Sequence, residues 1–460
     1  MARSSAYVGV AIACATLPGL VHADPNVDAL QAELAALKSD YATRIGALEQ
    51  RIAELETNAA AAAPAEPTPP PVASPSAPSN ANAFNPSISL ILGGQYANLS
   101  EDPADYHIAG FLPSGDEVGP GERSFNLGES ELTLAASVDP YFSGNLTFSL
   151  TGENEIEVEE AWFRTQTLPA GLSLKGGRFL SGLGYLNEVH SHAWDFVDQP
   201  LVYQAFFGGQ LRQDGLQLKW LAPTDMFLEF GLEAGNGDGF PGTRRGANGL
   251  NGTTLFAHVG TDIGDNATWR GGVSWIDMRA SDREYDDVDS SGSDVTNAFT
   301  GTSRTWVADA TFKWTAPGDT RRRYLKLQGE YLDRTEDGSL AFDVTGLAAS
   351  GDYRSRQSGW YVQSIYQFLP RWRVGLRYDA LDSGAPDIGL VADGTLDRAD
   401  FPALASADPR RTSVMLDWNP SEFSRLRAQF AWDDARDAAT DEQLFLQYIY
   451  SLGAHGAHKF

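Results

Sequence analysis

Two histidines one residue apart, His190 and His192, stand in the stretch NEVHSHAWDF among carboxylates and aromatic residues. Imidazole beside carboxylate can bind a transition metal or act as a general base, so the pattern allows two kinds of chemistry. Zinc would need further ligands, and the nearest candidates along the chain are Glu188, Asp195 and Asp198. Two side chains two positions apart share a face only in an extended segment, so the fold around the stretch decides its role.

Two alternatives to a metal site follow from the neighbouring residues. A catalytic base would need a nucleophile, and the stretch contains no specific nucleophile motif, so we predict that the protein is not an enzyme. The simpler alternative is a polar loop anchored by Trp194 and Phe196, in which the histidines only form hydrogen bonds.

The first 83 residues indicate export and a separate N-terminal segment. Residues 1–23 fit a signal peptide, with Arg3 before an apolar run and small residues before the cleavage point, and the single cysteine lies within them. Apolar residues at heptad spacing predict a self-associating coiled coil over 24–58, in the periplasm. The Pro- and Ala-rich residues 59–83 predict an extended spacer.

Composition excludes some partners. A net charge of -27 argues against nucleic acid, whose phosphates require a basic surface. After the signal, no apolar run reaches the roughly 18 to 20 residues that a membrane-spanning helix needs. A membrane location would therefore require a barrel.

The remaining residues, 84–460, show the pattern of such a barrel. Sixteen short segments of alternating polarity lie between Ser87 and Leu452, and they predict an all-β fold, a 16-stranded antiparallel transmembrane β-barrel. Short turns and long polar connections alternate between them, as in outer-membrane barrels with periplasmic turns. The seven predicted turns lie at 139–140, 168–170, 222–225, 264–266, 316–319, 369–371 and 419–422. A soluble β-sandwich is the alternative, and the signal peptide and the turn asymmetry argue against it.

Alternation also predicts which charges face the lumen. Inward-facing acidic residues are expected at Glu131, Glu155, Glu157 and Glu159. Inward-facing basic residues are expected at Lys326, Arg373, Arg377, Arg411, Arg425 and Arg427. We therefore predict one acidic and one Arg-rich wall, whose transverse field would orient charged solutes; the alternative is a solvated face without selectivity. Trp162 is expected outside, and Glu160 would then also face lipid. This indicates either a bulge in the strand or a different register from the one assigned.

The sign of a preferred solute stays open. An Arg-rich wall suits carboxylates and phosphates, whereas the overall acidity favours cations. Acidic external loops such as 282–294 could bind Ca²⁺ or Mg²⁺ and bridge to lipopolysaccharide.

Five stretches of the sequence are distinctive: FNPSISLILGGQY from Phe84, LGESELTLAASVDPYFSG from Leu127, VEEAWF from Val158, GRFLSGLGYLNEVHSHAWDF from Gly177 and WLAPTD from Trp220. Together they resemble a proteobacterial outer-membrane family labelled zinc-regulated TonB-dependent receptor. Such receptors have a large folded plug and 22 strands, whereas this architecture is more similar to trimeric porins that carry an N-terminal coiled coil. The resemblance to porins implies an outer-membrane homo-trimer in contact with lipid and lipopolysaccharide, whose N-terminal region could also reach peptidoglycan.

The resemblance to porins also implies where the stretch with His190 and His192 lies in the barrel. In sixteen-stranded porins the third long loop folds into the barrel, so Glu188, His190, His192, Asp195 and Asp198 are expected to form the constriction. The favoured function is passive diffusion of small hydrophilic solutes with no required cofactor. The alternative is a receptor for zinc or a zinc complex, with His190 and His192 as ligands.

Overall fold

The computed structural model describes residues 86–115, 118–151, 155–243, 246–318, 323–437 and 439–453. The predicted signal peptide, coiled coil and linker lie outside these residues. Within them, none of the helices has the length and apolar character to cross a membrane.

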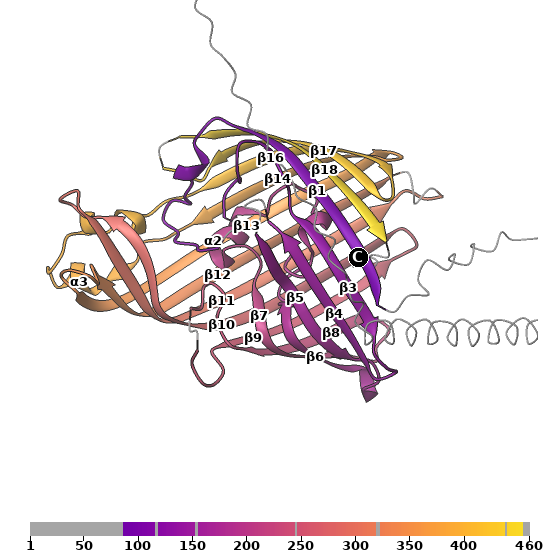
Figure 1. Ribbon diagram of the computed structural model, residues 1–460, viewed down its shortest axis with the longest axis horizontal. Coiled ribbons are helices and arrows are strands. Elements are labelled where there is room, and N and C mark those ends of the chain that lie inside the picture. The colour runs from indigo at the N-terminus through magenta and orange to yellow at the C-terminus, as the bar shows by residue number, and fades with distance from the viewer. Residues whose placement is uncertain are drawn as a thin grey trace, which may run out of the picture. The chain divides into compact units, whose positions relative to one another are not determined.

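The chain forms one closed ring of antiparallel strands (Figure 1). The first half of the ring comprises β1 (Ser87–Leu99), β3 (Ser130–Ser137), β4 (Phe142–Leu150), β5 (Ile156–Thr165), β6 (Leu172–Leu180), β7 (Arg212–Leu221), β8 (Phe227–Gly235) and β9 (Gly252–Ile263). The second half comprises β10 (Ala267–Val288), β11 (Asp294–Thr315), β12 (Tyr324–Phe342), β13 (Ala349–Leu369), β14 (Trp372–Asp382), β16 (Arg410–Ser421), β17 (Ser424–Asp434) and β18 (Asp441–Gly453). Pairing of β1 with β18 closes the ring, and the short β2 (Ser124–Asn126) and β15 (Asp387–Ile388) are added to β1 and β13. The predicted 16-stranded barrel is confirmed.

The helices are short and lie between strands. They are α2 (Leu201–Phe207), α3 (Gly389–Ala392) and the 3-10 turns Pro103–Asp105, Pro169–Gly171, Ser191–Ala193, Arg398–Asp400 and Pro402–Leu404. The helix α2 was not predicted from the sequence, because seven residues are too few for a helical hydrophobic period to stand out.

Short and long connections alternate as predicted, with two exceptions. Seven tight connections join β3–β4, β5–β6, β7–β8, β9–β10, β11–β12, β13–β14 and β16–β17 at one end of the barrel. At the other end, the expected long loops 280–302 and 335–356 are wrong, since β10 to β13 continue as strands through most of them. Polar residues on both faces hid these extensions, because strand alternation is visible only where one face is apolar.

The outer surface of the ring carries an apolar band. Val374 and Leu376 point outward and are exposed, while Arg373 and Arg377 on either side of them along β14 point inward. The same alternation runs through the neighbouring strands, with Leu416, Trp418, Leu426 and Trp432 outside. A continuous apolar belt of this kind on a closed barrel is typical of contact with lipid.

A β-bulge interrupts β5 and confirms the irregularity expected near Glu160. The register against β4 shifts between Thr147 and Phe148, which leaves Glu159 as an extra residue on β5. Consequently Glu159 and Glu160 both point inward and are buried. Beyond the bulge, each side chain of β5 points to the opposite face from the one expected. Trp162 therefore points inward, not outward as predicted, and the centroid of its ring lies 5.1 Å from the ammonium of Lys175.

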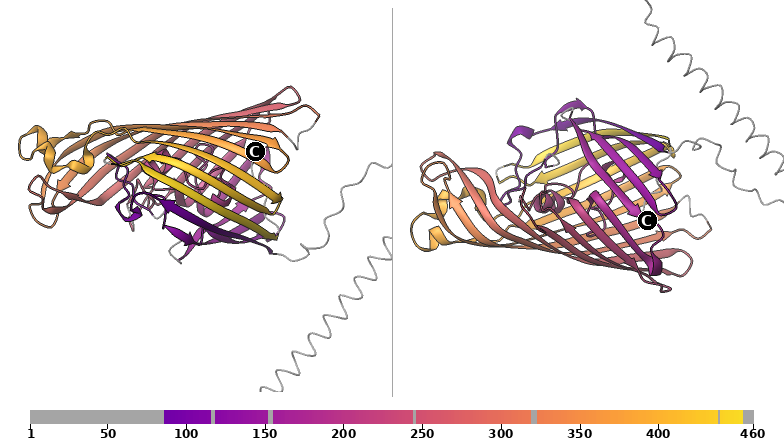
Figure 2. Two further views of the ribbon diagram at one scale, coloured as in Figure 1. Left: turned by 90° about the horizontal axis from the view of Figure 1, so that it is seen from above. Right: turned by 60° about the horizontal axis from the view of Figure 1, so that its bottom comes forward.

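The long connection between β6 and β7, residues 181–211, lies inside the ring and is called the inner loop below. Figures 1 and 2 show its helix α2 enclosed by the strands. All seven residues of α2 are buried, and its apolar side chains pack with Ile276, Val307 and Leu332 of the wall. One side of the lumen is therefore filled by an apolar core.

A second apolar core lies at the long-loop end. The projecting lobe comprises the ends of β10 to β13 and residues 383–409, which include α3 (Figure 2). Arg283 and Glu336 form a bidentate ion pair within it, with both distances 2.8 Å and side-chain exposures of 11% and 3%. Arg354 and Asp337 form an equally short pair on the outer surface, with exposures of 71% and 63%.

Truncation of these two pairs should destabilise the projecting lobe to different extents. Arg283→Ala should destabilise the projecting lobe by about 3–5 kcal/mol, because it leaves the Glu336 carboxylate buried without its cation. The matched change Arg354→Ala should cost about 1 kcal/mol or less, since its pair is solvated. Hydrogen exchange of the β10–β12 ends in the purified barrel measures both, and equal protection in the two variants would contradict the assignment.

Candidate functional site

The inner loop lies between two oppositely charged walls of the barrel. The basic wall consists of the six inward-facing basic residues predicted on β12, β14, β16 and β17, and every one of them contacts the loop. Its contacts with loop carboxylates are Lys326 to Asp195 at 3.0 Å, Arg373 to Asp195 at 3.1 Å, Arg377 to Asp198 at 3.0 Å and Arg411 to Asp198 at 2.7 Å. Arg425 and Arg427 donate to the backbone carbonyl of Trp194 at 3.1 and 2.9 Å. The predicted basic residues therefore anchor the loop.

The loop carboxylates are correspondingly stabilised as anions. Burial alone would raise the pKa of Asp195, but Lys326 and Arg373 outweigh burial and hold this pKa far below its usual value. Arg377 and Arg411 lower the pKa of Asp198 against the same effect of burial. Both anchors therefore persist at any mildly acidic pH.

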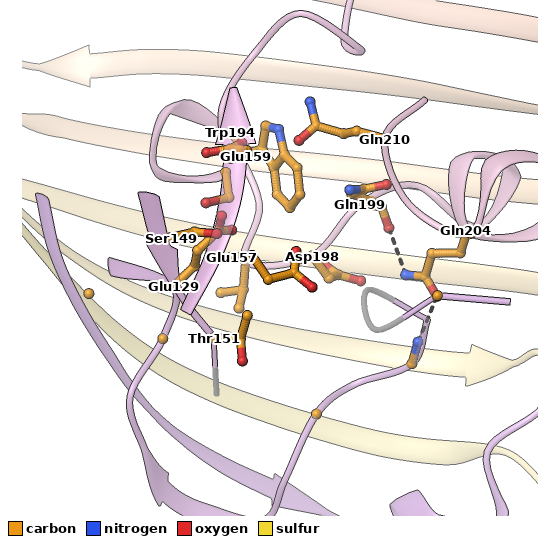
Figure 3. A pocket seen from close by; sticks show the side chains of 18 of the residues that line it. Glu129, Ser149, Thr151, Glu157, Glu159, Trp194, Asp198, Gln199, Gln204 and Gln210 are labelled. Carbon is orange, nitrogen blue, oxygen red and sulfur yellow. Dashed lines mark hydrogen bonds between the residues drawn. The ribbon is translucent and has the colours of Figure 1, made fainter. Parts of the chain in front are cut away.

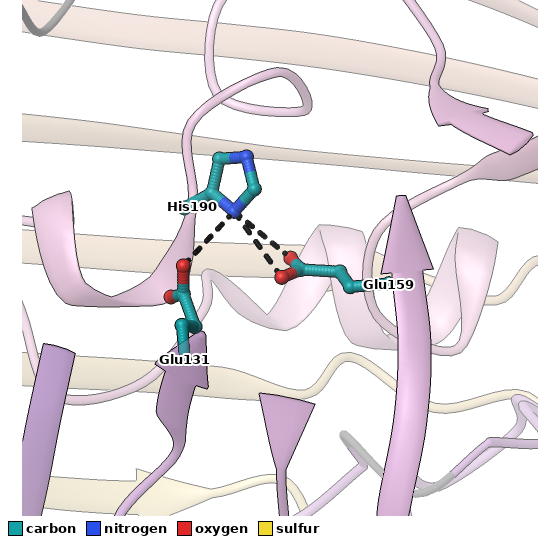
Figure 4. Close-up of side chains that lie close together, drawn as sticks. All are labelled: Glu131, Glu159 and His190. Atoms are coloured by element: carbon teal, nitrogen blue, oxygen red, sulfur yellow. Dashed lines mark hydrogen bonds and ion pairs between the residues drawn. The ribbon is translucent and has the colours of Figure 1, made fainter. Parts of the chain in front are cut away.

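The acidic wall meets the histidines of the loop. Glu131 on β3 lies 2.6 Å from Nδ1 of His192 and 3.3 Å from Nδ1 of His190. Glu159 of the β5 bulge lies 3.2 Å from that same His190 atom (Figure 4). Glu160 lies 3.3 Å from Nε2 of His190. The two histidines thus bind three buried glutamates, of which the sequence predicted Glu131 and Glu159 as inward-facing.

The other predicted acidic residues have different surroundings. Glu157 accepts a hydrogen bond from Arg212 at 3.1 Å, and Glu155 precedes β5 and is exposed. Glu188 on the inner loop binds Lys219 at 3.1 Å.

The further zinc ligands suggested by the sequence lie in ion pairs with basic residues. Glu188, Asp195 and Asp198 each bind a lysine or an arginine. The carboxylates beside His190 come instead from Glu131 and Glu159, with their ligand atoms within 4.8 Å of one another. The sequence pointed to carboxylates that are close to His190 along the chain, whereas the carboxylates that contact it lie on the strands β3 and β5.

Beside the inner loop lies a cavity of about 720 Å³. Figure 3 shows Glu129, Glu157 and Glu159 along one side of it, with Asp198 and the inner loop on the other. Its described lining contains six carboxylates, those of Glu122, Glu129, Glu157, Glu159, Asp198 and Asp238, against one guanidinium, that of Arg212, and His192. The cavity is strongly acidic. Among its described lining residues, His192 and Asp198 come from the predicted constriction, and Glu157 and Glu159 come from the predicted acidic lumen residues.

Comparison with known proteins finds a relative in Aquifex aeolicus. An uncharacterized protein of Aquifex aeolicus (strain VF5) is 32% identical over 414 residues, which cover 83% of this chain and 81% of that protein. The chain belongs to the family of this Aquifex protein. No family model matches the sequence.

Solved structures with a similar fold are bacterial outer-membrane proteins and channels. A loop-deletion mutant of OmpT, an outer-membrane protein of Vibrio cholerae, has a TM-score of 0.49 at 12% identity and covers 79% of this chain and 98% of its own. The outer-membrane channel DcaP of Acinetobacter baumannii has a TM-score of 0.46 at 13% identity, over 79% and 96% of the two chains. OprB of Pseudomonas putida has a TM-score of 0.46 at 14% identity, over 79% and 94%.

In this family member, the anchoring of the inner loop can be tested at Asp195. Asp195→Ala removes the carboxylate that faces Lys326 and Arg373, and loss of one partner from buried ion pairs costs about 3–5 kcal/mol. We expect the inner loop to become protease-sensitive between residues 181 and 211 while the barrel stays intact.

The matched control is Asp333→Ala, which removes a carboxylate from a pair with Arg356 whose guanidinium is exposed on the outer surface. Mass spectrometry of the fragments reports the cleavage positions. Protection of the inner loop in Asp195→Ala equal to that in the control would show that these ion pairs do not hold it.

Proposed function

We propose that this protein is an outer-membrane porin through which small hydrophilic solutes diffuse passively. One observation supports the proposal: inside a closed 16-stranded barrel, an inner loop binds both charged walls and borders an acidic cavity. The outward apolar band supports a position in a membrane, and the N-terminal signal predicted from the sequence supports export to the outer one.

The arrangement of charges favours cations as solutes. The basic wall does not offer its guanidinium groups to the lumen, because the inner loop covers them with Asp195, Asp198 and backbone carbonyls. The acidic side faces the cavity with Glu129, Glu157 and Glu159. A unit charge about 10 Å from a monovalent ion in water changes its energy by about 0.4 kcal/mol, which is about a factor of two in local concentration. Several such carboxylates in one constriction would enrich cations and deplete anions.

A reversal-potential measurement tests this selectivity. In a potassium chloride gradient across a planar bilayer, we expect the purified protein to conduct K⁺ in preference to Cl⁻. Glu129→Gln should lower the cation-to-anion permeability ratio by about two- to fourfold, because it removes one charge from the constriction.

The matched control for this change is Glu284→Gln, which removes the same charge from an exposed position on β10. It should leave the ratio unchanged. An anion preference in the unmodified protein, or equal effects of the two variants, would refute the cation-selective constriction.

The alternative function is a zinc receptor energised from the inner membrane, of the kind that the sequence resemblance names. The contact of His190 with the carboxylates of Glu131 and Glu159 is compatible with zinc binding. It does not indicate that uptake is energised. Single-channel recordings separate the two functions, because a porin gives steady open-state current and a plugged receptor gives little. Absence of current from a folded barrel would overturn the porin proposal.

The proposed partners follow from the same location. We propose that the protein forms a homo-trimer whose apolar band contacts lipid and lipopolysaccharide. We also propose that the acidic residues 282–294 bind Ca²⁺ or Mg²⁺ and that the N-terminal region contacts peptidoglycan. Deletion of residues 24–83, followed by measurement of oligomer size in detergent, tests whether the predicted coiled coil holds a trimer together.

A further inference from the structure

Inside the barrel, we propose that Glu131, Glu159 and His190 form a binding site for one divalent transition-metal ion. The three ligands come from β3, the β5 bulge and the inner loop, and their ligand atoms lie within 4.8 Å of one another (Figure 4). The site is independent of the proposed porin activity, since it concerns binding to the folded barrel.

The spacing of the ligand atoms fits a metal of the size of zinc. Zinc bonds to nitrogen and oxygen of about 2.0–2.1 Å place the ligand atoms of a tetrahedral site about 3.3–3.4 Å apart. Nδ1 of His190 lies 3.3 Å from Glu131 Oε2 and 3.2 Å from Glu159 Oε1. An ion can therefore replace these direct contacts with little movement of the His190 ring.

Two of the three ligands also have the supporting contacts that metal ligands need. Glu160 lies 3.3 Å from Nε2 of His190, so its carboxylate can accept a hydrogen bond from Nε2–H, which leaves the Nδ1 lone pair free for the ion. His192 lies 2.6 Å from Glu131 Oε1 and orients that carboxylate through its other oxygen. His192 thus supports a ligand, in contrast to the pair of histidine ligands expected from the sequence.

Charge balance supports the same conclusion. Glu131, Glu159 and Glu160 are all buried, and burial of three carboxylates in one place requires compensating positive charge. A divalent cation coordinated by neutral imidazole supplies two charges at the centre of this group. The mixed nitrogen and oxygen ligands favour Zn²⁺, Co²⁺ or Mn²⁺ over Ca²⁺ and Mg²⁺, which bind oxygen ligands.

The site is open to the cavity on one side. Glu159 and His192 line the cavity, so an ion can reach the ligands from the lumen, and the fourth position faces water or a solute. A bound ion would join the inner loop to β3 and β5 in addition to the ion pairs that fix its opposite side.

Metal binding to the full-length protein purified in detergent and stripped with a chelator tests the proposal. We expect one Zn²⁺ per chain by calorimetry, and Co²⁺ should give visible absorption bands typical of four- or five-coordinate cobalt. His190→Ala and Glu159→Gln should abolish the cobalt spectrum, and Glu160→Gln should weaken Zn²⁺ binding by about 10–100-fold as a supporting residue.

Two controls separate this site from adventitious binding. Glu188→Gln changes a carboxylate of the same loop that binds Lys219, and it should keep full Zn²⁺ affinity. Alanine at both His455 and His458, the other closely spaced histidines of the chain, should also keep it. Circular dichroism and heat-modifiable mobility establish that each variant is folded. Unchanged cobalt spectra in folded His190→Ala and Glu159→Gln, or no Zn²⁺ binding by the unmodified chain, would overturn the proposal whether or not the barrel conducts ions.

Discussion

The structure of the barrel interior depends on electrostatic complementarity between the inner loop and the wall. The loop presents carboxylates, Asp195 and Asp198, to the basic wall and histidines, His190 and His192, to the acidic one. A long polar segment inside a barrel has a high conformational entropy cost, and several buried ion pairs with defined geometry offset it. Because each contact has a charge-matched partner, the loop has one orientation across the lumen rather than many.

The apolar core around α2 has the complementary role of closing one side of the lumen. Its side chains pack against inward-facing Ile276, Val307 and Leu332, which form an apolar patch on the inner face of β10 to β12. The cavity lies on the acidic side of the inner loop, where residues of β4 and β5 line it. Packing decides where the cavity lies, and the carboxylates of that side decide its charge.

The β5 bulge connects the wall to the loop. Without the extra residue, Glu159 and Glu160 would point to opposite faces, and one of them would lie in the apolar band. With it, both carboxylates reach His190 from different sides, one at each ring nitrogen. The same local irregularity turns Trp162 inward, so one inserted residue changes the surroundings of the whole strand.

Much of the fold could be predicted because a membrane barrel imposes a period of two on its strands. The alternation around Arg373 and Arg427 and the seven turns followed from the sequence, and so did an irregularity near Glu160. The ends of β10 to β13 could not be predicted, since beyond the apolar band neither face has to be apolar. The helix α2 was too short to leave a pattern.

The candidate site divides in the same way. The sequence by itself predicted the inward-facing basic residues and Glu131 and Glu159, and it placed His190 and His192 in a long connection, because strand alternation and turn spacing are local properties. Only the tertiary structure decided which inward charges meet. The basic residues lie under the loop and bind Asp195 and Asp198. Glu131 contacts His190, which is 59 positions away along the chain. Such pairings depend on how the loop crosses the lumen, and no local pattern in the sequence carries that information.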